Sequence, residues 1–237
     1  MAFVGIDAIV YGATDMAQAR RLFLDWGLRK VEDKRSGLVF ATELGPEVVV
    51  RPDGAPGLRP KIAETCQFRE VIFGVSSRAH LAQLKRELSR DRELLVDADG
   101  TLHCTDDSGV NIGLRVWRHG REKKLGVTQW NGPGNRPRVN RVGPRYTQAH
   151  PYKIGHIVFF VPDVRVAERF YRERLGFFLS DRYAGGAASY LRWASKSEHH
   201  NLFLARSKTG KVDLNHVAFE LHDLHEDRKS TRLNSSH

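Results

Sequence analysis

An internal repeat constrains the fold of this chain more than any other feature. The stretch IDAIVYGATDMAQARRLFLDWGL aligns with GHIVFFVPDVRVAERFYRERLGF at an offset of 148 residues, so that Ile9 meets Ile157 and Asp15 meets Asp163. In each copy an apolar, β-rich run ends at an aspartate suited to N-cap a helix, and a glycine suited to end that helix follows. Each copy therefore predicts a strand, a turn and a helix.

Short β-type runs follow both helices, which makes the repeating unit β-α-β-β-β. They read LVFATEL and EVVVRP in the first copy, and SYLRWA and NLFLAR in the second. A related unit begins at REVIFGV, passes through the helix-like SRAHLAQLKRELSR with Leu81, Leu84 and Leu88 on one face, and ends with ELLVDA, LHCTD and NIGLRVW. A fourth opens at LNHVAFEL. We expect an α+β fold with three complete βαβββ units and the start of a fourth.

The units group into two domains joined by a basic linker. We expect the first domain at residues 1–116, a Gly, Pro and Arg-rich linker at 117–151, and an incomplete second domain at 152–226. The net charge is +10, but nine basic residues and one acidic residue between Trp117 and Lys153 account for +8 of it. Because this charge is confined to the linker and the C-terminal tail, we predict no nucleic-acid partner.

The remaining composition indicates a cytoplasmic globular protein. No apolar run approaches the roughly 20 residues needed to cross a bilayer, and the start MAFVGIDAIV lacks the pattern of a signal peptide. Cys66 and Cys104 are far apart in sequence, so neither a disulfide nor a thiolate metal site is expected. Because no apolar run is long enough to cross a bilayer, we also expect no membrane partner.

Histidines in repeated positions point to a metal centre. His156 lies in the first strand of the third unit and His216 in the first strand of the fourth. If these strands run side by side, both imidazoles can point into one cavity, and neutral imidazole binds divalent first-row metals. The same positions in the first half hold Ala8 and Glu70, so no metal is expected there. A structural role is the alternative for either histidine taken alone.

These motifs resemble the vicinal-oxygen-chelate superfamily, which includes glyoxalases, bleomycin resistance proteins and extradiol dioxygenases. Within it, GHIVFFVPD, HHNLFL and LNHVAFEL are similar to the two-domain, type I extradiol ring-cleaving dioxygenases, over residues 4–225. The resemblance implies Fe(II), with Mn(II) as an alternative, bound by His156 and His216, and an acid/base role for His200. It also implies two vicinal-oxygen-chelate domains, a homo-oligomer, and cleavage of a catechol-type aromatic diol by O₂.

The chemistry that the resemblance implies explains these residue types. A facial set of two histidines and one carboxylate leaves positions open on Fe(II) for a diol and for O₂. A histidine that titrates near neutrality suits the transfer of the proton, which favours His200. We expect His199 to face the opposite side of its strand, where it packs or forms hydrogen bonds. His150 and Tyr152 precede the third unit and are further candidates for lining the pocket.

The third ligand implied by the resemblance is a glutamate on the last strand of the fourth unit, which we expect to lie beyond this chain. Glu220 is four strand residues from His216, about 13 Å away, and Glu226 falls at the start of the next helix. Residues 227–237, DRKSTRLNSSH, lack the apolar positions of that helix and resemble a translated sequencing adapter. We therefore expect a non-native tail and a truncated, nearly inactive chain.

Two other classes of function remain open. One is another metal-dependent enzyme of the superfamily, such as an isomerase, epimerase or glyoxalase-like protein that polarises a carbonyl. The other is a protein that sequesters an aromatic compound without turnover. The four-unit layout and His200 favour the dioxygenase.

Overall fold

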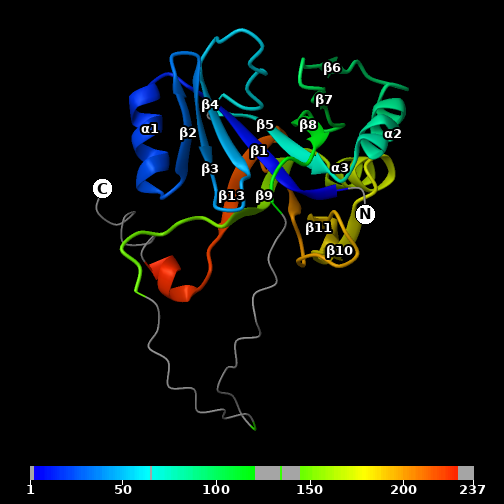
Figure 1. Ribbon diagram of the computed structural model, residues 1–237. Coiled ribbons are helices and arrows are strands. Elements are labelled where there is room, and N and C mark those ends of the chain that lie inside the picture. Colours follow the sequence, from blue (N-terminus) through cyan, green and yellow to red (C-terminus); the bar gives the residue numbers. More distant parts are fainter. Residues whose placement is uncertain (1–2, 65, 121–133, 135–144, 229–237) are drawn as a thin grey trace.

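Two β-sheets organise the computed structural model, which describes residues 3–64, 66–120, 134 and 145–228. The larger sheet has eight strands in the order β2-β3-β4-β1-β5-β8-β7-β6, and the smaller has five in the order β10-β11-β12-β9-β13 (Figure 1). The central strand β5 is buried at every residue, including the charged residues Arg69 and Glu70. Within the described ranges, none of the helices has the length and apolar content needed to span a bilayer.

Each unit follows the predicted β-α-β-β-β order. The first consists of β1 (Phe3–Ala13), α1 (Met16–Asp25), β2 (Arg29–Lys34), β3 (Gly37–Ala41) and β4 (Glu47–Pro52). The second consists of β5 (Phe68–Val75), α2 (Arg78–Leu88), β6 (Leu95–Val96), β7 (Leu102–Thr105) and β8 (Asn111–Val116). The third consists of β9 (Lys153–Val161), α3 (Val164–Arg169) with its π-helical extension η1 (Phe170–Arg174), β10 (Phe178–Arg182), the short turn η2 (Ala184–Gly186), β11 (Ala188–Arg192) and β12 (Leu202–Arg206). β13 (Asp213–Glu220) opens the fourth, and residues 224–228 are helical.

The helix boundaries confirm the signals of the repeat. The side chain of Asp15 accepts hydrogen bonds from the backbone N–H groups of Ala17 and Gln18, and Asp163 caps α3 in the same way. Gly27 and Gly176, which follow the two helices, have φ values of 82° and 79°. This left-handed conformation favours glycine because it has no Cβ. Local capping therefore sets both ends of these helices.

The first strands of neighbouring units pair in the same way in both sheets. β1 runs antiparallel to β5, and β9 runs antiparallel to β13. Glu70 pairs with Val10 in the larger sheet, and His216 pairs with Val158 in the smaller one. Because Val10 and Val158 are equivalent in the repeat, the register places Glu70 and His216 in equivalent positions, as the sequence predicts.

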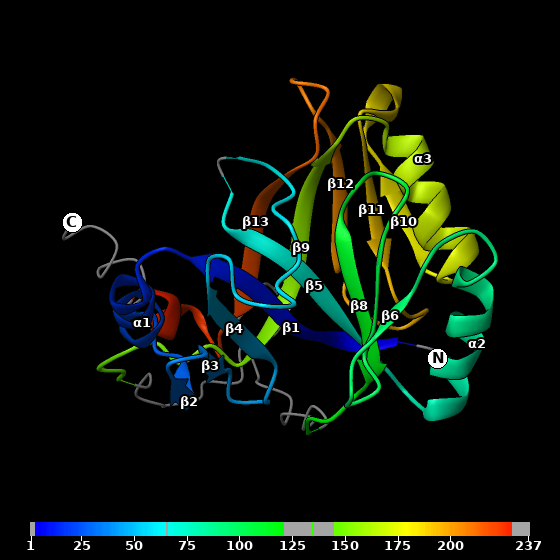
Figure 2. The same cartoon turned by 90° about the horizontal axis from the view of Figure 1, so that it is seen from above.

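The two sheets share one hydrophobic core. At the boundary between the sheets, the ring of Phe3 in β1 packs against the ring of Phe177, which precedes β10, with centroids 5.0 Å apart. Figure 2 shows α2 beside the third-unit helix, and there the guanidinium of Arg174 donates to Glu87 at 2.7 Å and to Asp91 at 2.6 Å. Apolar burial and ion pairs therefore hold the second and third units together.

Asp106 is a buried carboxylate at this same boundary, and we expect it to make stability depend on pH. It is 5% exposed, accepts a hydrogen bond from the hydroxyl of Tyr171 at 2.9 Å, and burial raises its pKa to about 6. A raised pKa stabilises the folded state at low pH, and this contribution disappears as the pH rises through 6. Between pH 7.5 and 4.5, the native protein should gain about 2 kcal/mol of unfolding free energy relative to Asp106→Asn. Urea unfolding of both proteins measures this difference, and parallel pH profiles would contradict it.

One sequence prediction is wrong, and others concern residues that the structure does not describe. His199 and His200 precede β12, which begins at Leu202, so they lie in a loop and not on a strand. The linker predicted at 117–151 and the tail at 227–237 lie largely outside the described residues, and the domain boundaries stay predictions. Cys66 and Cys104 are both free thiols.

Candidate metal centre

The side chains of His156 and His216 meet between β9 and β13. Their Nε2 atoms are 3.2 Å apart and their ring centroids 5.3 Å apart. Two nitrogen ligands, each about 2.1 Å from one ion and about 90–110° apart, are separated by about 3.0–3.4 Å. The separation in this structure therefore fits two adjacent ligands of one cation, and the two side chains converge as the sequence predicts.

A neighbouring amide orients the His216 ring. Nδ1 of His216 lies 2.7 Å from Oδ1 of Asn215, so the ring donates Nδ1–H to this oxygen. The lone pair of Nε2 is then available on the side that faces His156. Hydrogen bonds of this kind commonly fix the tautomer and orientation of metal-binding histidines.

His200 and His199 lie together beside this pair. The ring centroid of His200 is 4.6 Å from that of His156 and 5.1 Å from that of Tyr190, which stacks on Phe203 at 4.3 Å. Nδ1 of His199 is 3.2 Å from Nδ1 of His200, and the His199 ring also contacts Tyr190. The expectation that His199 faces the opposite side is therefore wrong, because strand alternation does not apply in a loop.

The surroundings of His156, His200 and His216 favour the neutral form of these three imidazoles. Burial, together with His200 and His216, lowers the pKa of His156 to about 4. Burial also lowers the pKa of His200 and of His216. Because a neutral imidazole offers a lone pair to a cation, this environment favours metal binding at neutral pH.

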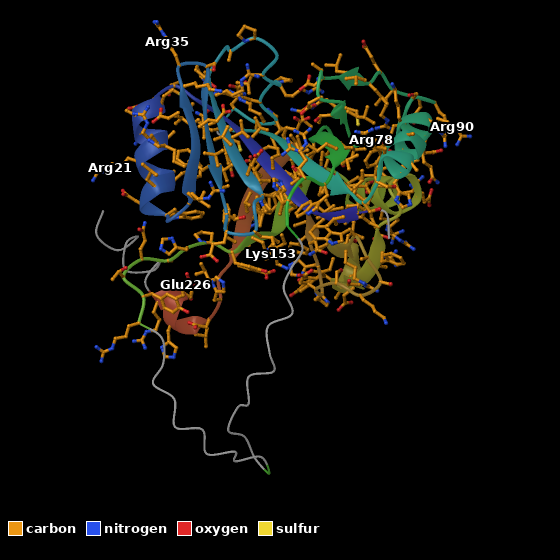
Figure 3. All side chains as sticks on the ribbon, in the orientation of Figure 1. Arg21, Arg35, Arg78, Arg90, Lys153 and Glu226 are labelled. Atoms are coloured by element: carbon orange, nitrogen blue, oxygen red, sulfur yellow. The ribbon has the colours of Figure 1, made fainter. Side chains whose placement is uncertain are left out.

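Neither Glu220 nor Glu226 completes the site. Oε2 of Glu220 lies 3.3 Å from Nζ of Lys153. Glu226, labelled in Figure 3, is 1% exposed, and it accepts hydrogen bonds from the backbone N–H groups of His150 and His222. Within the residues that the structure describes, no group of three or more His, Cys, Asp or Glu side chains is arranged to hold a metal ion. The described site therefore supplies two nitrogen ligands.

The equivalent positions in the first half carry different chemistry. Ala8 has no ligating atom, and Glu70 is 3% exposed with Oε1 2.9 Å from Nδ1 of His103. Nε2 of His103 lies 3.1 Å from a carboxylate oxygen of Asp97. Burial lowers the pKa of His103, but the hydrogen bond and charge of Glu70, with help from Asp97, raise it overall. Glu70 is thus engaged in a hydrogen bond with His103 within its own sheet.

His150 and Tyr152 contact other groups. Nδ1 of His150 lies 3.3 Å from the carbonyl oxygen of Gly27, and the ring of Tyr152 packs on His222 with centroids 5.1 Å apart. These contacts join the start of β9 to the first unit and to the segment after β13. They lend no support to a pocket role for either residue, which stays a prediction.

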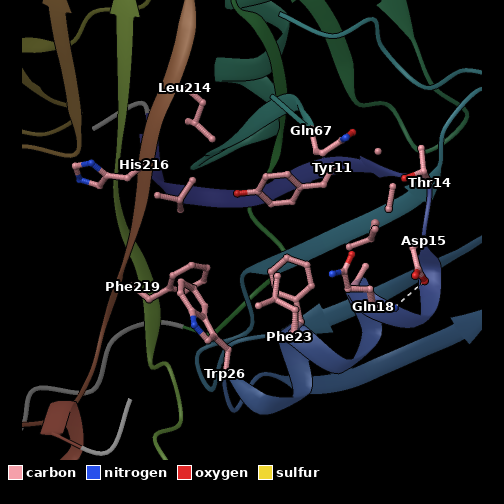
Figure 4. Close-up of a pocket in the computed structure, with 16 residues that line it drawn as sticks. Tyr11, Thr14, Asp15, Gln18, Phe23, Trp26, Gln67, Leu214, His216 and Phe219 are labelled. Atoms are coloured by element: carbon pink, nitrogen blue, oxygen red, sulfur yellow. Dashed lines mark hydrogen bonds between the residues drawn. The ribbon is translucent and has the colours of Figure 1, made fainter. Parts of the chain in front are cut away.

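An apolar cavity lies between α1 and β13. It has a volume of about 690 Å³, and Figure 4 shows α1 and β13 on its two sides with the imidazole of His216 pointing away from it. Trp26 and Phe219 meet there with ring centroids 5.2 Å apart. His216 thus lines the cavity, but its imidazole extends away from it and toward His156.

Comparison with known proteins agrees with the fold and the repeat. A family model described as "Glyoxalase/Bleomycin resistance protein/Dioxygenase superfamily" matches residues 153–237. No curated protein sequence matches.

Solved structures of similar fold include both glyoxalases and dioxygenases. A Mn(II)-bound glyoxalase from Novosphingobium aromaticivorans is 20% identical, with a TM-score of 0.71 over 99% of this chain and 71% of that one. BphC, a halotolerant catechol dioxygenase, is 16% identical, with a TM-score of 0.72 over 98% of this chain and 75% of that one. The 2,3-dioxygenase LapB from Pseudomonas sp. KL28 is 15% identical, with a TM-score of 0.72 over 99% and 81%. Residues 153–237 are therefore similar to the glyoxalase/bleomycin resistance protein/dioxygenase superfamily, also called the vicinal-oxygen-chelate superfamily, and the whole chain shares the fold of these solved structures.

Proposed function

We propose that this protein is a metal-dependent, extradiol-type dioxygenase, which opens the ring of a catechol-type compound. The observation that carries the proposal is the 3.2 Å separation of the Nε2 atoms of His156 and His216, with the ring of His200 beside them. The BphC and LapB structures, which are dioxygenases of similar fold, support this choice within the superfamily. Fe(II) is the proposed metal, and Mn(II) has the same preference for nitrogen and oxygen ligands.

The residues of this chain would divide the work between metal binding and proton transfer. His156 and His216 would hold the cation through Nε2, and a bound Fe(II) would bring the diol and O₂ together on one centre. His200 would accept or donate the proton at its ring nitrogen, because it lies beside His156 and is not itself engaged by a carboxylate in the described contacts. The apolar rings of Tyr190 and Phe203 would exclude water from that side.

The third ligand is proposed to be an acidic side chain on a strand that pairs with β13. In the larger sheet β5 has β1 on one side and the parallel strand β8 on the other, whereas in the described part of the smaller sheet β13 pairs with β9 alone. A strand equivalent to β8 would approach His216 from the unpaired side of β13. We therefore expect the 237-residue chain to turn over very slowly by itself.

The test loads the 237-residue protein with Fe(II) and offers it a panel of catechols under air and under nitrogen, with and without added formate or acetate. The small carboxylate can occupy the position of the missing ligand, so we expect slow, O₂-consuming ring opening that the added carboxylate accelerates. If the protein binds Fe(II) but forms no ring-opened product under any of these conditions, the proposed dioxygenase function is wrong.

A glyoxalase-type isomerase is the second candidate, and the fold shared with the Mn(II)-bound glyoxalase favours it. Such an enzyme would polarise a carbonyl without consuming O₂, so its turnover would be equal under air and nitrogen. A sequestering protein would bind the aromatic compound and return it unchanged. The catechol panel therefore separates the dioxygenase from the sequestering protein, and the same comparison of air with nitrogen on an α-oxo aldehyde and its thiol adduct tests the isomerase.

A further inference from the structure

Lys153, Glu198 and Asn201 form a polar cluster that holds the loop carrying His199 and His200. Lys153 is the first residue of β9, and its ammonium group contacts the Glu198 carboxylate within the loop (Figure 3 labels Lys153). Partial burial raises the pKa of Glu198, but Lys153 and Asn201 lower it below its ordinary value overall. Glu198 is therefore ionised, and its contact with Lys153 is charge-assisted and stronger than a neutral hydrogen bond.

Asn201 links this loop to the strand that carries His156. Its side chain is fully buried, and Nδ2 donates to Oε2 of Glu198 at 2.9 Å and to the carbonyl oxygen of Gly155 at 3.3 Å. The backbone carbonyl oxygen of Asn201 accepts a hydrogen bond from the backbone N–H of Ile157 at 3.0 Å. The residue that follows His200 is thus bonded to both chain neighbours of His156.

This arrangement accounts for the proximity of two rings on different segments. His200 lies in the loop before β12, next to Asn201, whose backbone bonds to Leu191 and Ile157, and the ring of His200 is 4.6 Å from that of His156. Loops retain a single geometry only where side chains or backbone contacts hold them. The buried amide of Asn201 and the Lys153–Glu198 ion pair supply those contacts.

We propose that Lys153, Glu198 and Asn201 are positioning residues, which keep the imidazole of His200 over the metal centre. The proposal rests on the proposed function, since it gives His200 its proton-transfer role. None of the three touches the ring nitrogens of His156 or His216 in the described contacts, so they act through the loop. Their loss should therefore misplace His200 while metal binding survives.

The test compares Lys153→Met with Lys153→Arg, and with Lys211→Met as a control on an exposed loop residue that removes the same charge. Lys153 is at the edge of the cluster, so Lys153→Met is the variant best able to fold. Asn201→Ala, at a fully buried position, is the second variant. Co(II) titration gives the metal affinity, and nuclear Overhauser contacts between the ring protons of Tyr190 and His200 report the loop geometry.

We expect the Tyr190–His200 ring contacts to disappear in Lys153→Met, and to persist in Lys153→Arg and Lys211→Met. Co(II) affinity should change by less than the roughly 10-fold typical of losing a group that orients a ligand. With Fe(II) and formate, kcat for diol cleavage should fall by about 10- to 100-fold at unchanged KM.

Two results would overturn the positioning role. The first is that the ring contacts stay intact in both Lys153→Met and Asn201→Ala. The second is that Co(II) affinity falls by roughly 10-fold or more together with the loss of the contacts, which would indicate a merely structural role. Failure of the proposed function gives a different result, because Co(II) would then bind the native protein and His156→Ala equally, whatever happens to the loop.

Discussion

Replacing His216 with alanine should lower the affinity of the protein for Co(II) or Fe(II) by at least about 100-fold, since the loss of a group that merely orients a ligand already costs about 10- to 100-fold. The physical reason is the 3.2 Å separation of the two Nε2 atoms, which provides one ion with two adjacent nitrogen ligands. The described residues contain no third ligand that could compensate. Titration against a competing chelating dye measures this change.

Comparison with other histidine variants makes this prediction specific. His156→Ala should weaken binding as much as His216→Ala, and the double variant should cost little more, because one remaining imidazole holds the ion poorly. His225→Ala is the matched control, since His225 is exposed and lies in the helical segment after β13. An affinity that falls equally in His225→Ala and His216→Ala would locate the metal elsewhere.

The second large effect concerns a buried ion pair in the larger sheet. The guanidinium of Arg115 on β8 contacts the fully buried carboxylate of Asp7 on β1, and it lies 3.1 Å from Oε2 of Glu47. Arg115→Met leaves the carboxylate of Asp7 buried, and among the described contacts its remaining charged or titratable partner is His119, whose Nε2 is 3.2 Å away. Because a buried charge without its partner is costly, we expect the unfolding free energy to fall by about 3 kcal/mol or more.

The double variant Asp7→Asn/Arg115→Met tests the origin of this loss. If the unpaired charge causes it, removing that charge should recover most of the stability, since a neutral amide is cheaper to bury. Urea unfolding of the two single variants and the double variant provides the coupling energy. A loss in Arg115→Met of about 1 kcal/mol or less, typical of an exposed ion pair, would show that His119 alone suffices for Asp7.

Local patterns in the sequence predict most of the fold. Asp15 and Asp163 cap helices, and apolar, β-rich runs mark β1, β4 and β9, because capping and strand propensity act over a few neighbouring residues. The convergence of the His156 and His216 side chains is also predictable from the sequence, since duplicated units pair their first strands in the same way. β2 is the counterexample: it reads RKVEDK and is exposed throughout, so it carries no apolar signal.

The sequence by itself therefore determined the repeat, the ends of the helices and the two strand positions that carry His156 and His216. Only the tertiary structure decided that His199 and His200 share a loop, and that Lys153 and Asn201 hold this loop against β9. The reason is physical. A strand position inherits its direction from the regular alternation of the backbone, whereas a loop side chain is placed by contacts with residues distant in sequence, and no local pattern records those contacts.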